Sequence, residues 1–257
     1  MSIQFVKIFG ERNTGTNVLS LYIKRNTSCK LCGGTFAEIS ETSLDKFKFT
    51  SRLERERLID IFFLGLPPSN QWKHAATNFE DRELSDFANK CVIITLRNPI
   101  SWVFGLYKNP YNALTDTSGL TLEQFICTKW TTLKRDRLNL NLVTPPELIS
   151  LKMQSYCNFS DRLEKLGQEI KFVNFESFIL DPQITWSRIS STFVNSKTTV
   201  DVIKQSVKDK SKDVEYYKDY YGNERWRDKV SNAAFAEISE NIDWNSYNRL
   251  KKMCDFN

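Results

Sequence analysis

The sequence predicts an α/β fold with a central, mainly parallel sheet flanked by helices. Short apolar runs rich in β-branched and aromatic residues recur along the chain. Each run ends in a polar turn that leads into a segment with helical spacing of apolar residues. Strand–loop–helix units in series favour parallel strands, because a crossover helix returns the chain to the same end of the sheet.

The first unit begins at the N-terminus. Residues Ile3–Phe9 alternate in part and are rich in Ile, Val and Phe, which predicts a strand. The strand ends at Gly10 and a polar loop. The apolar residues after that loop share one face of a predicted helix: Val18, Leu19, Tyr22 and Ile23.

The second unit lies near the middle of the chain. Cys91–Leu96 is a continuous apolar run, as expected for a strand that is buried on both faces. It ends in a polar turn that starts at Arg97, and a helix is predicted over about Ser101–Tyr107. Pro99 fits the start of that helix, because proline is favoured in the first helical turn.

The remaining elements extend the pattern. Arg52–Leu58 alternates in charge sign and predicts an exposed helix. Lys171–Phe175 is a third predicted strand, and a helix starts at Asp181-Pro182. A long helix that Gly167 caps is predicted from these residues of one face: Leu148, Leu151, Tyr156, Phe159, Leu163 and Leu166.

Composition and charge limit the classes of function. The 257 residues are 40% apolar and 26% charged, which is ordinary globular composition, and no linker divides them, so one domain over residues 1–257 is expected. The net charge of +5 suits an anionic ligand and is too small for a surface that coats nucleic acid.

The apolar runs are too short to insert into a bilayer, and the N-terminus has no apolar signal core, so a cytoplasmic location is expected.

The cysteines and the single histidine indicate no metal site. Cys29 and Cys32 form a Cys-x-x-Cys pair, but a zinc site needs four ligands and no second pair follows. The six cysteines are expected to be reduced thiols.

The loop after the first predicted strand has the composition of an anion-binding turn. Gly10 and Gly15 allow tight turns that present backbone N–H groups, and the start of the following helix adds a positive dipole end. Thr14 and Thr16 offer hydroxyl groups, and the Arg12 guanidinium can donate two parallel hydrogen bonds to a phosphate or sulfate. The alternative is a capped strand-to-helix turn with solvated polar residues.

This loop lacks the residues of a nucleoside-triphosphate site. Its G-x-x-x-x-G spacing matches a Walker A loop, but Thr16 replaces the lysine and Asn17 replaces the magnesium-binding hydroxyl. The second strand ends in Arg97 and offers no carboxylate for a metal ion. The loop is therefore predicted to hold an oxyanion without triphosphate chemistry.

The loop after the second predicted strand offers another cationic group. Arg97 stands at the strand end and Ser101 follows one turn later, and both can donate to a second phosphate. Alternatively, Arg97 pairs with a carboxylate at the edge of the sheet. The residue pattern alone leaves both interpretations open.

Together the two loops resemble the sulfotransferase superfamily, whose members use 3′-phosphoadenosine 5′-phosphosulfate (PAPS). The matching segments are GERNTGTN after the first strand and LRNPISW after the second. The resemblance implies a P-loop-like sulfotransferase fold. It also implies that Arg12–Asn17, including Asn13, binds the 5′-phosphosulfate and that Arg97 with Ser101 binds the 3′-phosphate.

Further short matches run from end to end of the chain. Gln71–His74 resembles the WKH element of a bacterial-type branch, and Pro146–Tyr156 resembles another segment of that branch. Val173–Pro182 and the C-terminal ISENIDWNSYNRLKKM resemble two later family segments.

The sequence departs from the family pattern at two positions. Many members have a lysine where this chain has Asn13, so the charge that assists the leaving phosphate is expected from Arg12, Lys73 or both. A serine often lies where this chain has Gly105, which leaves Ser101 as the substitute.

His74 is the candidate general base. Histidine titrates near neutrality and can accept the proton of an attacking hydroxyl. From chemistry alone, a structural hydrogen-bonding role is the alternative, and the resemblance of Trp72-Lys73-His74 favours catalysis. Lys73 or Arg12 is the candidate cation beside the bridging oxygen.

A late segment is a candidate wall of the nucleotide cleft, because family members bring such a segment over the nucleotide. Lys212 or Lys218 is a further candidate for the 3′-phosphate. Core packing is the alternative for the four tyrosines of this segment: Tyr216, Tyr217, Tyr220 and Tyr221.

The sequence therefore predicts a PAPS-dependent sulfotransferase that converts a hydroxyl acceptor into a sulfate ester and releases adenosine 3′,5′-bisphosphate without a metal. The acceptor is expected to bind between Cys29–Gln71 and Pro110–Thr144, whose composition suits a sugar, an acidic glycan, a phenol or a lipid head group, with preference for a carbohydrate. The alternatives are a P-loop nucleotide-dependent kinase and a non-catalytic anion- or glycan-binding module of the same fold.

Overall fold

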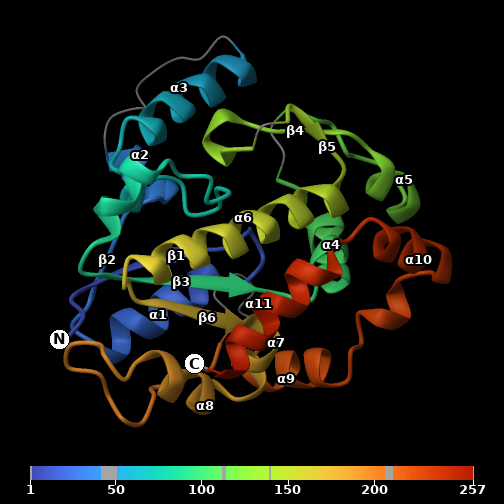
Figure 1. Cartoon of the computed structure of the whole chain (residues 1–257). Coiled ribbons are helices and arrows are strands. Elements are labelled where there is room, and N and C mark those ends of the chain that lie inside the picture. The colour runs from blue at the N-terminus through green and yellow to red at the C-terminus, as the bar shows by residue number, and fades with distance from the viewer. Residues whose placement is uncertain (1, 42–50, 112–113, 139, 206–210, 257) are drawn as a thin grey trace.

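A four-stranded, all-parallel sheet forms the centre of the computed structural model, which describes residues 2–41, 51–111, 114–138, 140–205 and 211–256 (Figure 1). Its strand order is β2-β1-β3-β6. The expected α/β architecture with a central parallel sheet and flanking helices is thereby confirmed. The strands are β1 (Phe5–Phe9), β2 (Lys30–Leu31), β3 (Lys90–Leu96) and β6 (Ile170–Asn174).

The register brings the carboxyl ends of the strands to one edge. β1 pairs with β3 up to Phe9 opposite Ile94, and β3 pairs with β6 up to Leu96 opposite Asn174. The chain passes from β1 to β2 on one side and then to β3 on the other side of β1. The direction of the winding thus reverses between β1 and β3, and ligands of open α/β sheets bind at such a reversal, beyond the carboxyl ends.

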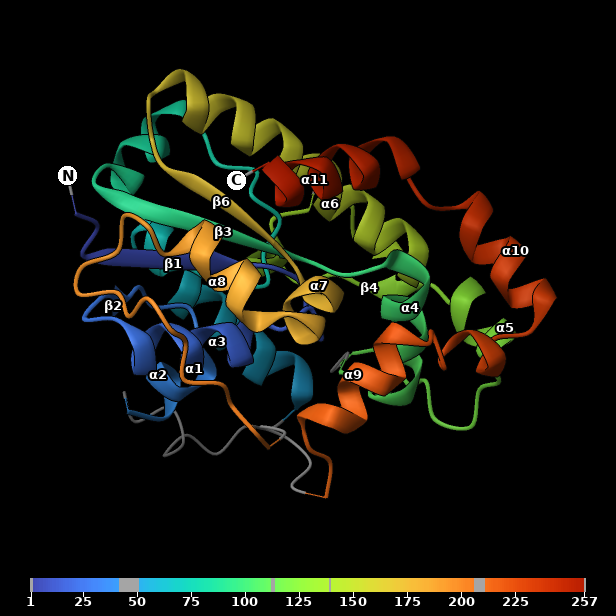
Figure 2. The same ribbon diagram turned by 90° about the horizontal axis from the view of Figure 1, so that it is seen from below.

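Helices cover both faces of the sheet. Figure 2 shows α6 (Pro145–Lys165) and α11 (Trp244–Phe256) on one side and α1 (Thr16–Asn26) and α8 (Pro182–Ile189) on the other. Successive residues of β3 join different hydrophobic clusters, because side chains alternate between the faces of a strand. The prediction of a strand buried on both faces is confirmed.

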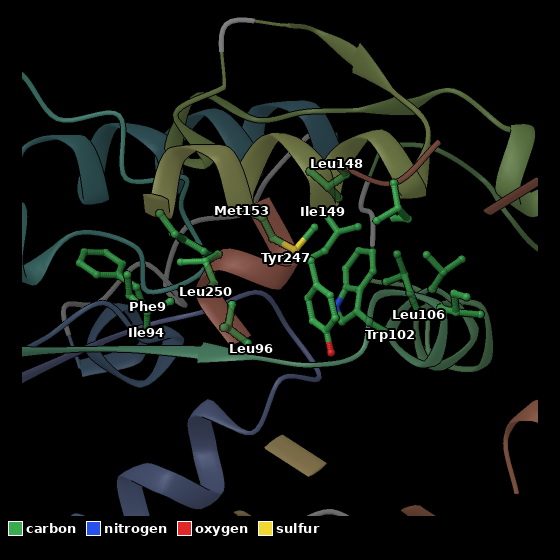
Figure 3. Packing of buried hydrophobic residues seen from close by; sticks show 14 of the residues in the cluster. Phe9, Ile94, Leu96, Trp102, Leu106, Leu148, Ile149, Met153, Tyr247 and Leu250 are labelled. Carbon is green, nitrogen blue, oxygen red and sulfur yellow. The ribbon is translucent and has the colours of Figure 1, made fainter. Parts of the chain in front are cut away.

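The larger cluster fills the space between the sheet and helices α6 and α11. In Figure 3, Ile94 and Leu96 of β3 face Met153 of α6 and Leu250 of α11. Trp102 of α4 (Pro99–Lys108) extends the cluster beyond the end of β3. The packing therefore fixes the start of α4 against the carboxyl edge of the sheet.

The other elements surround this centre. Two short strands, β4 (Trp130–Thr131) and β5 (Leu142–Val143), form a separate antiparallel pair. The remaining α-helices are α2 (Phe36–Glu41), α3 (Arg52–Leu64), α5 (Leu122–Cys127), α7 (Phe175–Leu180), α9 (Val214–Gly222) and α10 (Asn232–Glu240). The 3₁₀ helices in the described part of the chain are η2 (Pro68–Asn70), η3 (Asp81–Phe87), η4 (Lys134–Asp136) and η5 (Arg227–Lys229).

Several predicted boundaries shift for local reasons. Helix α4 starts at Pro99 rather than Ser101, because the Asn98 side chain accepts hydrogen bonds from the N–H groups of Ile100 and Ser101 at 3.0 and 3.1 Å. The first strand is shorter than predicted, and Ile3 instead makes an isolated parallel bridge.

Both segments expected to build the acceptor pocket extend into residues that the structure does not describe. Residues 42–50, 112–113 and 139 of the segments expected to build the acceptor pocket lie outside the described residues, as do residues 206–210. None of the described helices combines the length and apolarity needed to cross a membrane.

The prediction that Arg52–Leu58 is an exposed helix is wrong for one face of it. Helix α3 continues to Leu64, and Glu56 and Asp60 are only 2% and 6% exposed. Their i, i+4 spacing puts both carboxylates on one face, where the buried Arg135 pairs with each of them. An alternating charge pattern did not reveal this distant partner.

Replacing Arg135 by methionine is expected to lower the free energy of unfolding by about 3–5 kcal/mol, because the buried Asp60 then loses its cation and Glu56 keeps only the half-exposed Arg55. Urea denaturation measures the change. Arg55→Met is the matched control: Arg55 contacts Glu56 at 2.9 Å, but its side chain is 49% exposed, so its loss should cost less than about 1 kcal/mol. Equal costs for the two variants would contradict this assignment.

Candidate functional site

The loop between β1 and α1 packs closely against the ends of β3 and β6. A Cβ atom at Gly10 would lie 1.9 Å from the Thr95 hydroxyl oxygen, and one at Gly15 would lie 2.5 Å from the Phe175 ring. Gly15 also has a φ of 88°, in the left-handed region. Glycine at both positions therefore lets the loop sit at the carboxyl edge of the sheet.

The start of α1 is open to an anion. No side chain caps the helix at Gly15, and its first turn contains no acidic residue. Gly15, Thr16 and Asn17 line a large cavity beside this end. The first N–H groups of a helix lack intrahelical partners and carry the positive end of the dipole, so this edge suits phosphate or sulfate.

Thr14 has a different place from the one expected. Its side chain is 2% exposed and its hydroxyl donates to the Glu11 carbonyl at 2.5 Å and lies 2.8 Å from the Thr95 hydroxyl. The residue is absent from the described lining of the cavity. Its hydroxyl therefore holds the loop in shape and does not face a ligand.

A buried ion pair supports the loop from behind. Glu11, 1% exposed, pairs with Lys152 of α6 and accepts a hydrogen bond from the Tyr111 hydroxyl at 2.5 Å. The Lys152 ammonium also donates to the His74 carbonyl at 2.6 Å. Neither Glu11 nor Lys152 was predicted as a site residue, although a carboxylate inside a cationic loop is a signal for an internal partner.

Lys7 fixes the segment that carries the predicted catalytic residues. Its side chain is completely buried, and its ammonium donates to the carbonyls of Gly33 and Gln71 at 2.7 and 2.6 Å. Burial lowers the pKa of Lys7 to about 7. The segment after Gln71 is thus tied to β1 from one side and to α6 from the other.

His74 is held as a neutral imidazole. Its Nδ1 lies 2.6 Å from the Gly10 carbonyl oxygen, which can only accept, so Nδ1 carries the proton and Nε2 is the basic nitrogen. Burial, with the nearby charges of Lys73 and Arg12, holds the pKa of His74 well below its usual range. His74 lines the cavity and is unprotonated at neutral pH.

Lys73 and Arg12 lie beside this histidine. The Lys73 ammonium donates to the Asn17 amide oxygen at 2.5 Å, and burial together with the charge of Arg12 lowers the pKa of Lys73 to about 8. The Arg12 guanidinium lies 4.1 Å from the ring centre of Tyr111 and 5.3 Å from that of Trp72. Among the described residues it has no ion-pair partner.

Arg97 pairs with a carboxylate, as one of its two interpretations predicted, and it also lines the cavity. Its guanidinium lies 3.8 Å from the Glu176 carboxylate. It donates to the Asn13 carbonyl at 3.1 Å and lies beside the rings of Phe175 and Tyr221, at 5.5 and 5.2 Å from their centres. Contacts inside the protein therefore hold the Arg97 side chain in place while it lines the cavity.

Ser101 and Gly105 shape the surroundings of Arg97. The Ser101 hydroxyl is buried, accepts a hydrogen bond from Arg97 Nε at 2.9 Å, and is absent from the described cavity lining. It thus orients the arginine. A Cβ at Gly105 would lie 3.0 Å from Arg97 Nη1, so glycine there lets α4 pass close to the guanidinium.

Helix α9 contributes an aromatic wall. Its tyrosines at positions 216, 217, 220 and 221 all line the cavity, as does Lys212. Lys218 instead pairs with Glu215 at 3.1 Å and is absent from the described lining. The four tyrosines thus line a cavity, as expected for a cleft wall, and Tyr221 also packs into the core.

The large cavity has a volume of about 860 Å³ and a one-sided charge. Its described lining contains no aspartate or glutamate. Its cationic residues are Arg12, Lys73, Arg97, Lys108, Lys212 and Lys229. Since like charges around one space repel each other, this lining is suited to a ligand with several negative charges.

The structure brings most of the predicted site residues to this cavity. Thr14 and Ser101 are buried beside it and fix the loop and Arg97. The predicted residues that line it are Arg12, Asn13, Gly15, Thr16, Asn17, Lys73, His74 and Arg97.

The cysteines take no part in the site. Within the described chain, no three His, Cys, Asp or Glu side chains are grouped to hold a metal ion. Cys29 is buried and donates to the Ile3 carbonyl at 3.2 Å, and Cys32 is a half-buried free thiol.

In comparisons with known proteins, no family model and no curated protein matches this sequence. The chemistry of the site therefore rests on its own residues.

The Lys7 side chain gives a pH-dependent contribution to stability. Its pKa is about 7 in the folded chain and about 10.5 when unfolded, so the unfolded state binds more protons between these values. The stability that Lys7 contributes must therefore rise with pH above 7, by up to about 1.4 kcal/mol per pH unit. Between pH 7 and 9, the free energy of unfolding of the wild type, measured by urea denaturation, should increase by about 2–3 kcal/mol relative to that of Lys7→Met. Exposed Lys24→Met is the control and should show no such trend; a flat difference for Lys7→Met would refute the assignment.

Proposed function

We propose that the protein is a PAPS-dependent sulfotransferase with a P-loop-like sulfotransferase fold. The observation that carries this proposal is the large cavity at the carboxyl edge of the sheet, with six cationic residues and no carboxylate in its described lining. The donor is a nucleotide with anionic groups at both its 5′ and 3′ positions, and cations come from the β1–α1 loop and from the start of α4. The tyrosines of α9 and Phe175 supply flat surfaces for a base.

The proposed reaction needs few groups from the protein. The acceptor oxygen forms a bond to sulfur while the bond between sulfur and the bridging phosphate oxygen breaks. The hydroxyl proton passes to Nε2 of His74, and the bond's electron pair leaves on the phosphate. Arg12 and Lys73 neutralise the charge that develops there, by analogy with phosphoryl transfer.

The residues favour this reaction over triphosphate chemistry. Thr16 and Asn17 stand where a Walker A loop needs a lysine and a hydroxyl for magnesium. The described cavity lining offers no carboxylate for the metal ion of a kinase. The position of His74 on the cavity lining, next to Lys73 and Arg12, also favours an enzyme over a non-catalytic anion-binding module.

Calorimetric titration with adenosine 3′,5′-bisphosphate tests the donor site. Metal-independent binding is expected, and Arg97→Ala should weaken it about tenfold to a hundredfold, because one charge-assisted contact is lost. Arg162→Ala is the control, since Arg162 pairs with the exposed Asp81 and lies outside the described cavity lining. Preference for Mg²⁺-ATP would replace the proposal with the kinase, and binding of neither nucleotide would overturn it.

The His74→Asn variant tests the general base. An asparagine amide can replace Nδ1 as the donor to the Gly10 carbonyl but offers no basic nitrogen in place of Nε2. We expect kcat for sulfuryl transfer to fall about 10²- to 10⁴-fold with unchanged affinity for the bisphosphate. Transfer from labelled PAPS and calorimetry measure the two quantities. Unchanged turnover would assign His74 a purely structural role.

A further inference from the structure

A smaller chamber, with a volume of about 240 Å³, adjoins the large cavity. The two spaces share the side chains that were assigned to the reaction, Arg12 and His74, and three aromatic rings, Phe36, Trp72 and Tyr111. We propose that this chamber holds the acceptor and selects an uncharged hydroxylated ring, a sugar or a phenol, over its acidic counterparts. This inference rests on the proposed function and specifies its second substrate.

Aromatic rings form much of the chamber wall. Trp130 packs against Tyr111 with ring centres 5.4 Å apart, and Phe36 packs against Trp72 at 5.0 Å. Trp130 is 4% exposed and lines the small chamber but is absent from the described lining of the large cavity. Such flat apolar surfaces suit the face of a single ring.

The charges of the small chamber differ from those of the large cavity. Its three carboxylates already have internal partners: Glu56 pairs with Arg55 and Arg135, and Glu11 pairs with Lys152. The third, Asp136, accepts a hydrogen bond from the Leu133 N–H group at 2.9 Å. The ionic groups are thus largely balanced within the protein.

An acidic acceptor would meet these carboxylates at short range. Burial already raises the pKa of Asp136, although Lys152 lowers it, so the chamber disfavours negative charge. Arg12 is the cation that both spaces share. A donor bound in the large cavity would already pair with the Arg12 guanidinium. An additional carboxylate would lose hydration without gaining a free cation among the described lining residues.

The size of the chamber limits what reaches His74. Pockets for drug-sized ligands measure about 300–1,000 Å³, and this chamber is smaller. It therefore fits one ring, with any larger part of the acceptor extending outside. A hydroxyl on that ring can approach Nε2 of His74, whose other nitrogen is fixed by Gly10.

Matched acceptor pairs test the selection. Protein saturated with adenosine 3′,5′-bisphosphate is titrated by saturation-transfer NMR with methyl glucoside against methyl glucuronide, and with 4-methylphenol against 4-hydroxybenzoate. In the pair whose ring binds more tightly, sugar or phenol, the uncharged member should bind about tenfold more tightly than the acidic member. The reason is that the carboxylate loses hydration without gaining a cation. Labelled PAPS then shows which ring, sugar or phenol, receives the sulfuryl group.

Leu133→Trp tests the location, because Leu133 lines only the small chamber among the two described linings. Filling the chamber should weaken acceptor binding at least about tenfold and leave bisphosphate binding unchanged. Leu142→Trp on the neighbouring β5 is the matched control, since Leu142 is 53% exposed. Thr131→Tyr is a second filling variant should Leu133→Trp not fold.

The outcomes separate the inference from the proposed function. Equal or tighter binding of the acidic members, an unaffected Leu133→Trp protein, or no binding of any ring to the bisphosphate complex would overturn the inference alone. Failure to bind the bisphosphate would overturn the proposed function and, with it, this assignment of the chamber.

Discussion

The buried pair of Glu11 and Lys152 is the constraint on which the site depends. Both side chains are almost fully removed from water, at 1% and 2% exposure, so each must replace its hydration with contacts inside the protein. Tyr111 and the Arg12 N–H group donate to the carboxylate, and the ammonium donates to the His74 carbonyl. These contacts exist only when the first loop, the segment at His74 and helix α6 are all in place.

This pairing also explains the charge of the large cavity. Glu11 belongs to the same loop as Arg12, yet its carboxylate turns toward α6 and leaves the cavity without an acid from this loop. Burial, together with the resulting concentration of positive charge, lowers the pKa of Lys73 and keeps His74 neutral. These cations repel each other, so a polyanion bound among them would be stabilised by the charges that otherwise destabilise the site.

Local patterns were sufficient for the three longer strands, β1, β3 and β6, and for the two loops at their carboxyl ends, but not for the two-residue strands β2, β4 and β5. The continuous apolar run at Cys91–Leu96 indicated a strand buried on both faces because no alternation was present, and the sheet covers it on both sides. Gly10 and Gly15 indicated a tight loop, and the close approach of Thr95 and Phe175 explains why glycine is needed there. The same local reasoning failed at α3, where charge alternation gave no sign that Glu56 would be buried with Arg135.

The amino-acid sequence by itself determined the three longer strands, the helices α1 and α4 that follow two of them, the cationic loops, and the absence of a Walker lysine at Thr16. Tertiary structure decided which polar atoms face a ligand: the hydroxyls of Thr14 and Ser101 turned inward, whereas Arg12 remained exposed to the cavity. It also joined Glu11 to Lys152, 141 positions apart. The reason is physical. Strand and helix patterns depend on neighbouring residues, whereas burial, ion-pair partners and the walls of a cavity depend on segments that meet only when the chain is folded.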